Sequence, residues 1–340
     1  MSTRAATVST SIDGGRRRRR PGLLALVAAG AALVLMSGCS LQRPVGPAQT
    51  RYVDEVFASV GVQQNLAYGS ATGRTGQPET LLLDLYTPAG DTRTQRRPAV
   101  IWVHGGGFAV GGKADSNVVQ LATTFAKRGY VAASVNYRLL APQGCGGNPN
   151  PTQECINAAF GAQHDVQASV RWLRAHADQY GIDPNRIAVG GTSAGAVTSV
   201  LLATNATDPG DSGNPGYSSR VGGAVSISGG LPTNDLIDST DSPVLFFHGD
   251  QDTTVPFAWS AQNAAALLNA GVLTIWEPLA GAGHVPFAQY HTLFFEQSAY
   301  FLYLVLDLSH AGQAAVSKPQ SLRLDGGQRV VRGQGIVGPG

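Results

Sequence analysis

One serine lies in a sequence context that favours a catalytic nucleophile. Gly191-Thr-Ser-Ala-Gly195 has the pattern Gly-x-Ser-x-Gly, and it lies between a predicted strand at 186–190 and a predicted helix at 194–203. A tight strand-to-helix turn exposes the serine hydroxyl at the helix N-terminus, and the flanking glycines prevent side-chain clashes at the turn. An ordinary Gly-rich helix start can match the same short pattern. The strand–turn–helix context nevertheless favours Ser193 as the nucleophile of an acyl transfer.

A serine hydroxyl attacks a carbonyl efficiently only when a base removes its proton and a carboxylate orients that base. His284 ends the Gly-rich segment 278–284, after the last predicted strand, and can supply the imidazole. Asp250 and Asp252 both follow the apolar run 244–248, so the spacing fits either of them as the acid. The other aspartate would then hold its loop through a turn hydrogen bond.

Three consecutive glycines follow another predicted strand, in His104-Gly-Gly-Gly-Phe108. Attack on an ester turns its carbonyl oxygen into an oxyanion, and each preorganised N–H donor contributes on the order of 10²–10³ in rate. Backbone without side chains can present its amides to that oxygen, and the amide of Ala194 is a further donor at the start of the helix. The alternative is a flexible Gly-rich turn. His104 is expected to brace this turn, and His248 to make a structural hydrogen bond.

The elements that must position these residues alternate between strand and helix. Such alternation of near-continuous apolar strands with helices predicts an α/β fold with a mainly parallel central sheet and helices on both faces. Ligands bind beyond the carboxyl ends of the strands in such sheets, and each motif above follows a predicted strand. The predicted strands span 81–86, 99–103, 130–137, 186–190, 224–228, 244–248 and 272–276, and the predicted helices span 118–128, 165–180, 194–203, 257–270 and 287–308.

These motifs together resemble the α/β-hydrolase superfamily, and more narrowly the HGGG-type bacterial carboxylesterases related to hormone-sensitive lipase and to feruloyl or acetyl esterases. The order serine, aspartate, histidine along the chain is the one found in that superfamily. The resemblance covers residues 81–308 and rests on 104–108, 136–139, 191–195, 248–252 with 255–256, and 283–284. It implies that Ser193 is the nucleophile, Asp252 the acid and His284 the base, with Gly106, Gly107 and Ala194 as oxyanion donors and no cofactor or metal.

The N-terminal residues have the pattern of a lipoprotein export signal. Arg16–Arg20 is a positive segment, and the apolar run of 15 residues at 22–36 is shorter than the approximately 20 residues of a membrane-spanning helix. Met36-Ser-Gly-Cys39 resembles a lipobox, with Cys39 as the lipid acceptor. We therefore expect a signal peptide at 1–38, a tether at 39–50, an α/β-hydrolase domain at 51–310, a loosely ordered tail at 311–340, and an extracytoplasmic, membrane-anchored protein. The alternative is an uncleaved N-terminal anchor.

The two remaining cysteines indicate a disulfide, and the net charge argues against nucleic acid as a partner. Cys145 and Cys155 lie ten residues apart in a loop rich in Gly, Pro and Asn, and in an oxidising compartment they are expected to form a disulfide rather than remain free thiols. Loss of residues 1–38 removes six arginines and one aspartate, so the net charge changes from +2 to about −3. This balance excludes a basic nucleic-acid-binding surface. The sequence indicates no oligomeric state.

The function predicted from the sequence is hydrolysis of small carboxylic esters through an acyl-enzyme at Ser193. An amidase or a prolyl-oligopeptidase-like peptidase would use the same triad, but the chain has no room for a propeller and shows no acidic pair that could bind a peptide N-terminus. A non-catalytic surface binding protein on a hydrolase scaffold is the other alternative. Such proteins have usually lost an essential catalytic group, and none is missing here.

Overall fold

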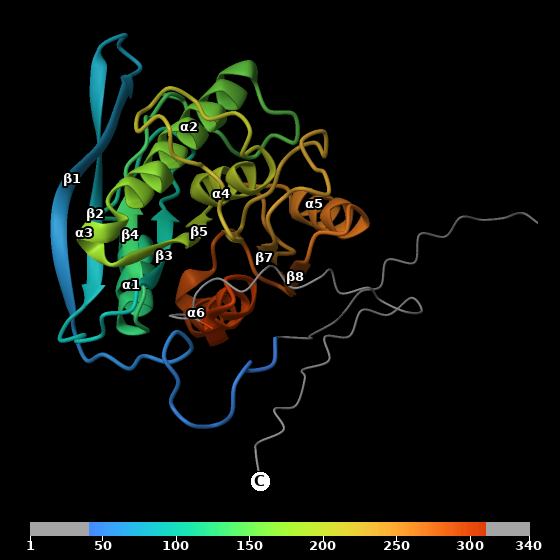
Figure 1. Cartoon of the computed structure of the whole chain (residues 1–340). Coiled ribbons are helices and arrows are strands. Elements are labelled where there is room, and N and C mark those ends of the chain that lie inside the picture. The colour runs from blue at the N-terminus through green and yellow to red at the C-terminus, as the bar shows by residue number, and fades with distance from the viewer. Residues whose placement is uncertain (1–40, 311–340) are drawn as a thin grey trace, which may run out of the picture. The chain divides into compact units, whose positions relative to one another are not determined.

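The computed structural model of the chain describes residues 41–310. The predicted signal peptide, the predicted lipid acceptor Cys39 and the predicted tail lie outside these residues. Residues 41–310 contain an eight-stranded sheet in the order β1-β2-β4-β3-β5-β6-β7-β8 (Figure 1). The strands β4, β3, β5, β6, β7 and β8 run parallel, and β2 is antiparallel to both of its neighbours. The sheet is therefore mainly parallel, as the sequence predicts.

The strands of this sheet follow the apolar runs of the sequence, with one exception. β1 is exposed along most of its length, and it was not predicted because its residues do not alternate between apolar and polar types. Its pairing with β2 holds it at the sheet edge. The bounds are β1 Val60–Thr72, β2 Pro78–Pro88, β3 Arg97–Val103, β4 Val131–Val135, β5 Ile182–Thr192, β6 Ala224–Ile227, β7 Val244–Gly249 and β8 Thr274–Leu279.

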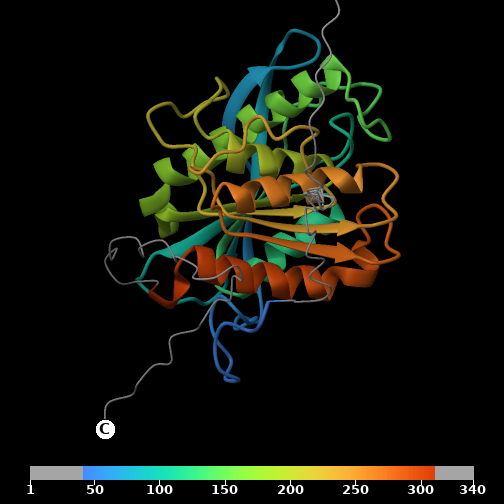
Figure 2. The same ribbon diagram turned by 90° about the vertical axis from the view of Figure 1, so that its right-hand side faces the viewer.

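Helices cover the two faces of the sheet, as the views along and across it show (Figures 1 and 2). In β3, Ile101 and Val103 pack into one buried cluster with residues of α2, α4 and α5, whereas Val100 and Trp102 pack into a second cluster with residues of α1 and α6. This alternation follows from the period of two along a strand. The helices are α1 Ser116–Lys127, α2 Gln153–Ala175, α3 Ala177–Tyr180, α4 Ala194–Thr204, α5 Phe257–Asn269 and α6 Phe287–Val305, followed by the short 3-10 helix η1 Leu308–His310.

The prediction of one helix over 165–180 is wrong at its start and in its continuity, although helical structure does end at Tyr180. α2 begins at Gln153, where the side chain of Thr152 accepts a hydrogen bond from the amide of Cys155 at 3.3 Å and so caps the helix. The Gly- and Pro-rich residues just before it concealed this start. At the other end His176 departs from helical geometry and separates α2 from the short helix α3.

The first described residues pack on the body of the fold. The amide of Leu41 donates to the side chain of Gln297 in α6 at 2.5 Å, and Leu41 packs against the apolar cluster on that face. Arg43 forms an ion pair with Asp54 at 2.5 Å. Among the helices of residues 41–310, none combines the length and the hydropathy that a membrane crossing requires.

Candidate active site

Ser193 occupies the sharp turn between β5 and α4. Its φ of 54° and ψ of −120° place a non-glycine residue in the positive-φ region, a strained conformation that persists only when its surroundings hold it. A Cβ on Gly191 would lie 2.4 Å from the carbonyl carbon of Gly195, and a Cβ on Gly195 would lie 2.1 Å from the carbonyl oxygen of Val103. Both glycines of the motif are therefore required by the close packing of this turn against its own helix and against β3.

A continuous chain of hydrogen bonds connects the three predicted triad residues. The Nε2 atom of His284 lies 2.8 Å from the Oγ of Ser193, and its Nδ1 lies 2.7 Å from Oδ2 of Asp252. Asp252 follows β7 and His284 follows β8, and both strands end at the edge where β5 ends, because the three run parallel. Imidazole bridging a hydroxyl and a carboxylate is the geometry that activates a serine for nucleophilic attack.

The carboxylate of Asp252 is fully saturated with hydrogen bonds. Its Oδ1 accepts from the amides of Thr254 at 2.8 Å and Val255 at 3.0 Å, and its Oδ2 faces Nε2 of His248 at 3.1 Å in addition to His284. Burial of the carboxylate would raise its pKa, but the hydrogen bonds from the two imidazoles and from the Val255 amide outweigh burial, so the pKa of Asp252 lies well below its ordinary value. Asp252 therefore stays ionised beside the imidazole.

Asp250, the other candidate acid, has a different place. Its Oδ1 accepts a hydrogen bond from the amide of Gly281 at 2.8 Å, so it connects the loop after β7 to the loop after β8. The structure thus brings Asp252, and not Asp250, to His284. Hydrogen bonds from His248 to Asp252 and to the carbonyl of Val255, both at 3.1 Å, agree with the structural role expected for that histidine.

The glycine turn after β3 is held so that two amides face the site. The carbonyl of Gly105 accepts from Nδ1 of His104 at 2.7 Å, and the carbonyl of Gly106 accepts from the amides of Ala109 at 3.0 Å and Val110 at 3.1 Å. In a trans peptide the C=O and the following N–H point in opposite directions. Fixing these two carbonyls therefore aims the amides of Gly106 and Gly107 the other way, and neither amide has a hydrogen-bond partner within residues 41–310.

The third predicted donor begins the helix after the nucleophile. Ala194 is the first residue of α4, and the first amides of a helix have no carbonyl partner within it. The amide of Ala194 follows Ser193 directly at the positive end of the helix dipole, and it has no hydrogen-bond partner within residues 41–310. A Cβ on Gly105 would lie 3.1 Å from the Cβ of Ser193, which shows how closely the glycine turn approaches the nucleophile. Gly106 and Gly107 line one cavity with Ser193.

His104 and Tyr137 form the support beneath the glycine turn. Their rings stack with centroids 4.2 Å apart, and the Tyr137 hydroxyl donates to the carbonyls of His104 and Gly105, each at 3.2 Å. Burial lowers the pKa of His104, and a neutral imidazole has one N–H to donate to Gly105. Burial also raises the pKa of Tyr137 well above its ordinary value, so its hydroxyl remains a donor. The bracing role expected for His104 is confirmed.

Part of this chain is similar in sequence to known hydrolases and esterases. The BD-FAE family model matches residues 83–220. Phenmedipham hydrolase of Pseudarthrobacter oxydans is 32% identical over 47% of this chain and 34% of its own length. Esterase LipQ of Mycobacterium tuberculosis is 26% identical over 57% of this chain and 51% of its own length. The chain thus spans between about a third and a half of the length of these two relatives.

The structure is similar to that of Est2, an esterase of Thermogutta terrifontis, with a TM-score of 0.59 at 24% identity over 76% of this chain and 96% of that one. The chain has the α/β-hydrolase fold. Within this fold the parallel strands β3, β5, β7 and β8 are each followed by one of the loops described above. The fold expected from the sequence is therefore confirmed.

A residue that sequence reasoning missed supports the histidine loop of this hydrolase fold. Ser228 follows β6, and its Oγ accepts a hydrogen bond from the amide of Val285 at 3.0 Å, directly after the catalytic-site imidazole. Phe108, Ser193, Ser228 and Val285 all have positive φ, between 45° and 60°. Each of the four follows a different strand of the sheet. The only sequence signal for Ser228 was its position at the carboxyl end of a predicted strand.

A cavity of about 580 Å³ opens above Ser193 and His284. Its walls are made mainly of glycine and polar residues, and its apolar side chains are few. The aromatic residues Phe257, Trp259 and Phe287 do not line it. The lining residues are Gly105, Gly106, Gly107, Asp115, Asn117, Val118, Gln143, Gly144, Cys145, Gly146, Thr192, Ser193, Thr254, His284 and Val285. In the part of the chain that the structure describes, no cluster of three or more His, Cys, Asp or Glu residues could hold a metal ion.

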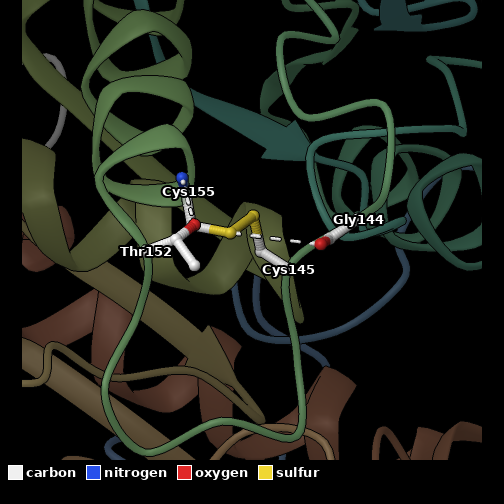
Figure 3. The surroundings of a disulfide bond; sticks show 4 residues. All are labelled: Gly144, Cys145, Thr152 and Cys155. Carbon is white, nitrogen blue, oxygen red and sulfur yellow. Dashed lines mark hydrogen bonds between the residues drawn. A yellow bond between two sulfur atoms is a disulfide. The ribbon is translucent and has the colours of Figure 1, made fainter.

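Cys145 and Cys155 form a disulfide, as predicted (Figure 3). Their Cα atoms lie 5.7 Å apart, and the bond joins the loop before α2 to the first turn of that helix. Cys145 is also a wall residue of the cavity, whereas Cys155 is not.

Proposed function

We propose that this protein is a serine carboxylesterase that hydrolyses small carboxylic esters through an acyl-enzyme at Ser193. The observation that supports this most strongly is the hydrogen-bonded chain from Ser193 through His284 to Asp252, beside a cavity that is also lined by Gly106 and Gly107, whose amides have no hydrogen-bond partner within residues 41–310. Esterases among the relatives and structural neighbours agree with the proposal.

In the proposed mechanism, His284 carries out each proton transfer of ester hydrolysis. His284 takes the proton of Ser193 as its Oγ attacks the ester carbonyl, and ionised Asp252 stabilises the imidazolium that forms. The amides of Gly106, Gly107 and Ala194 stabilise the negative charge on the tetrahedral oxygen. His284 then gives its proton to the leaving alcohol, and a water molecule activated by the same imidazole releases the acid from the acyl-enzyme.

The cavity supports esters with short acyl chains as the substrates. A long acyl chain needs an extended apolar channel, and the apolar side chains in this lining are only those of Val118, Cys145 and Val285. Structures of the Thermogutta esterase are described with propionate and with butyrate bound, both short carboxylates. By analogy we expect acetyl to butyryl esters to be hydrolysed faster than octanoyl esters.

Replacement of Ser193 by Ala tests the proposal directly. Hydrolysis of p-nitrophenyl acetate and butyrate should fall to background, and a fluorophosphonate probe should label the wild-type protein and not the variant. The far-ultraviolet circular dichroism spectrum should be unchanged, because Ser193→Ala removes one oxygen from the turn. Turnover of the variant at the wild-type rate would refute the assignment of Ser193.

A parallel assay separates the esterase from the alternatives. The matched anilides of the same short acids would be cleaved at comparable rates by an amidase, and we expect at least about a hundredfold preference for the esters. A well-folded wild-type protein that hydrolyses neither series and reacts with no organophosphate would instead support a binding role on a hydrolase scaffold.

We further propose that the protein is exported and anchored to a membrane through lipid on Cys39. The support is the arginine run, the short apolar segment and the lipobox-like Met36-Ser-Gly-Cys39 in the sequence. Two acyl chains on a diacylglyceryl cysteine give stable anchoring. Expression in a bacterium with labelled palmitate should label the wild-type chain in the membrane fraction. Cys39→Ala should abolish the label, and persistent labelling of this variant would contradict the proposal.

A further inference from the structure

The residues between β4 and α2 form a segment that crosses the cavity, and we refer to residues 141–152 as the strap. The strap has no helix or strand of its own, and most of its residues are exposed. Gln143, Gly144, Cys145 and Gly146 contribute one wall of the cavity that contains Ser193 and His284. A segment of this kind, with little buried surface, opens easily unless something fixes it.

The strap contacts the glycine turn at one end. The amide of Cys145 donates to the carbonyl of Gly107 at 2.9 Å, and the amide of Ala141 donates to the carbonyl of Phe108 at 3.1 Å. A Cβ on Gly107 would lie 3.1 Å from the nitrogen of Cys145 and 3.2 Å from its oxygen, so the two backbones are in close contact. The strap therefore packs directly on Gly107, the residue whose amide is the second predicted oxyanion donor, and it limits how far that residue can move away from the cavity.

The strap also reaches the loop that contains the triad carboxylate. The amide of Gly147 donates to the carbonyl of Thr254 at 2.6 Å, and the amide of Thr254 in turn donates to Asp252. A few backbone hydrogen bonds of an exposed segment are weak restraints, since each contributes about 1 kcal/mol in net terms.

The disulfide supplies a stronger restraint at the point of contact with the glycine turn. Cys145 donates its amide to Gly107, and its sulfur is bonded to Cys155 in the first turn of α2 (Figure 3). The following turns of α2 include the buried residues Ala158, Ala162 and Val166 of the main apolar cluster, so Cys155 is fixed to the core. The glycine turn is thus connected to a buried helix through one hydrogen bond and one covalent bond.

We propose that the Cys145–Cys155 disulfide is a positioning element of the active site, which holds the strap against Gly107 and thereby keeps the oxyanion amides in place. This inference rests on the proposed esterase function. Breaking the disulfide is expected to lower the rate of acyl transfer while the Ser193–His284–Asp252 chain stays intact. Even if the strap leaves Thr254, Asp252 keeps its hydrogen bonds with His248, His284 and the amide of Val255. Small misplacements of catalytic groups cost up to about a hundredfold in rate.

The test compares the oxidised wild-type protein with the Cys145→Ser/Cys155→Ser variant and with wild-type protein reduced by a phosphine. Both disulfide-free forms should show kcat for p-nitrophenyl acetate lowered about 10- to 100-fold, with KM changed much less. The pH at which kcat reaches half of its maximum should be the same in all three forms, since it reports the imidazole and not the amides. Reoxidation should restore the activity of the reduced wild-type protein, and the phosphine should not change the variant further.

Hydrogen exchange provides a readout that does not depend on activity. Deuterium uptake of a peptide covering residues 104–110 should increase when the disulfide is absent, whereas uptake of a peptide from β7 should not change. Unchanged uptake at 104–110 in folded, disulfide-free protein would overturn the inference even if the protein proved not to be an esterase. An unchanged kcat, a rise in KM alone, or a shifted pH profile would overturn it in an active enzyme.

Discussion

At the scale of single residues, the choice between two aspartates shows how far the sequence leads. Asp250 and Asp252 differ by two positions after the same strand, and spacing fits both. The structure distinguishes them by their hydrogen bonds. The carboxylate of Asp252 accepts hydrogen bonds from two imidazoles and two backbone amides, whereas that of Asp250 accepts one from the amide of Gly281. Resemblance to known esterases favoured Asp252 in advance. Its contact with His248 depends on how the loop folds back on β7, which no residue pattern encodes.

The four hydrogen bonds to the carboxylate of Asp252 predict a pH-dependent contribution to the stability of the fold. Its pKa is lower in the folded protein than the unfolded value of about 3.9, so its stabilising contribution is complete above that value and is lost as the pH falls through the folded-state pKa. The wild-type melting temperature should therefore fall between about pH 5 and pH 3, and it should fall less steeply in Asp252→Asn. Calorimetry over this range measures both slopes.

Ser193→Ala is the matched control for that experiment, because it alters the same hydrogen-bonded chain and keeps the carboxylate with its other partners. It should retain the wild-type slope. Equal slopes in wild type and Asp252→Asn would contradict the pKa assigned to Asp252.

At the scale of elements, the glycine turn after β3 was predictable because its chemistry requires bare backbone. The strands and most of the helices after them were predicted from apolar runs, and three consecutive glycines indicated a turn with exposed amides. The resemblance to known esterases supplied the identity of the predicted donors. Two features could not be predicted from the sequence. The exposed residues of β1 do not alternate between apolar and polar types, and the start of α2 directly follows a Gly- and Pro-rich loop. Pairing with β2 fixes β1 as a strand, and the cap by Thr152 fixes the first residue of α2.

Gly106 is the residue of this turn that is least able to accept a side chain. Its φ is +104°, and a Cβ would lie 2.1 Å from the carbonyl oxygen of Val110. In Gly106→Ala the turn must move, so kcat for short esters should fall on the order of 10²–10³ through misplaced donors. Steady-state kinetics with p-nitrophenyl acetate measures this change.

The control for Gly106→Ala is Gly46→Ala. A Cβ on Gly46 meets nothing within 4 Å, and Gly46 lies outside the cavity. Its kcat should match the wild-type value. A Gly106→Ala protein with full activity would show that this turn does not supply the oxyanion donors.

At the scale of the whole molecule, a buried ion pair connects the sheet edge to the helix layer. Arg138 follows Tyr137 of the site and pairs with Asp165 of α2 at 2.9 Å. Ser212 donates its hydroxyl to Asp165 at 2.6 Å, and its carbonyl accepts from the amide of Ser70 in β1 at 3.0 Å. This network gives the exposed edge strand a second attachment besides its pairing with β2. It was not visible in the sequence because its members are up to 142 residues apart.

Asp165→Asn should lower the free energy of unfolding by about 3–5 kcal/mol, because it leaves Arg138 buried without a counter-charge. Asp178→Asn is the matched control, since Asp178 pairs with Arg96 on the surface with 89% of its side chain exposed. Its cost should be about 1 kcal/mol or less. Urea denaturation measures the free energy of unfolding of both variants. Equal losses in the two would show that the buried network does not contribute more to stability than the surface ion pair.

The four non-glycine residues with positive φ at separate strand ends have a consequence for engineering. Conformations of this kind cost on the order of 1–3 kcal/mol each, and substitution by glycine would relieve part of that cost. Selection for heat resistance alone would therefore favour glycine substitutions at Phe108, Ser193, Ser228 and Val285. These same positions are Ser193 itself and residues of the loops around it, so gains in thermostability would be expected to reduce the proposed activity.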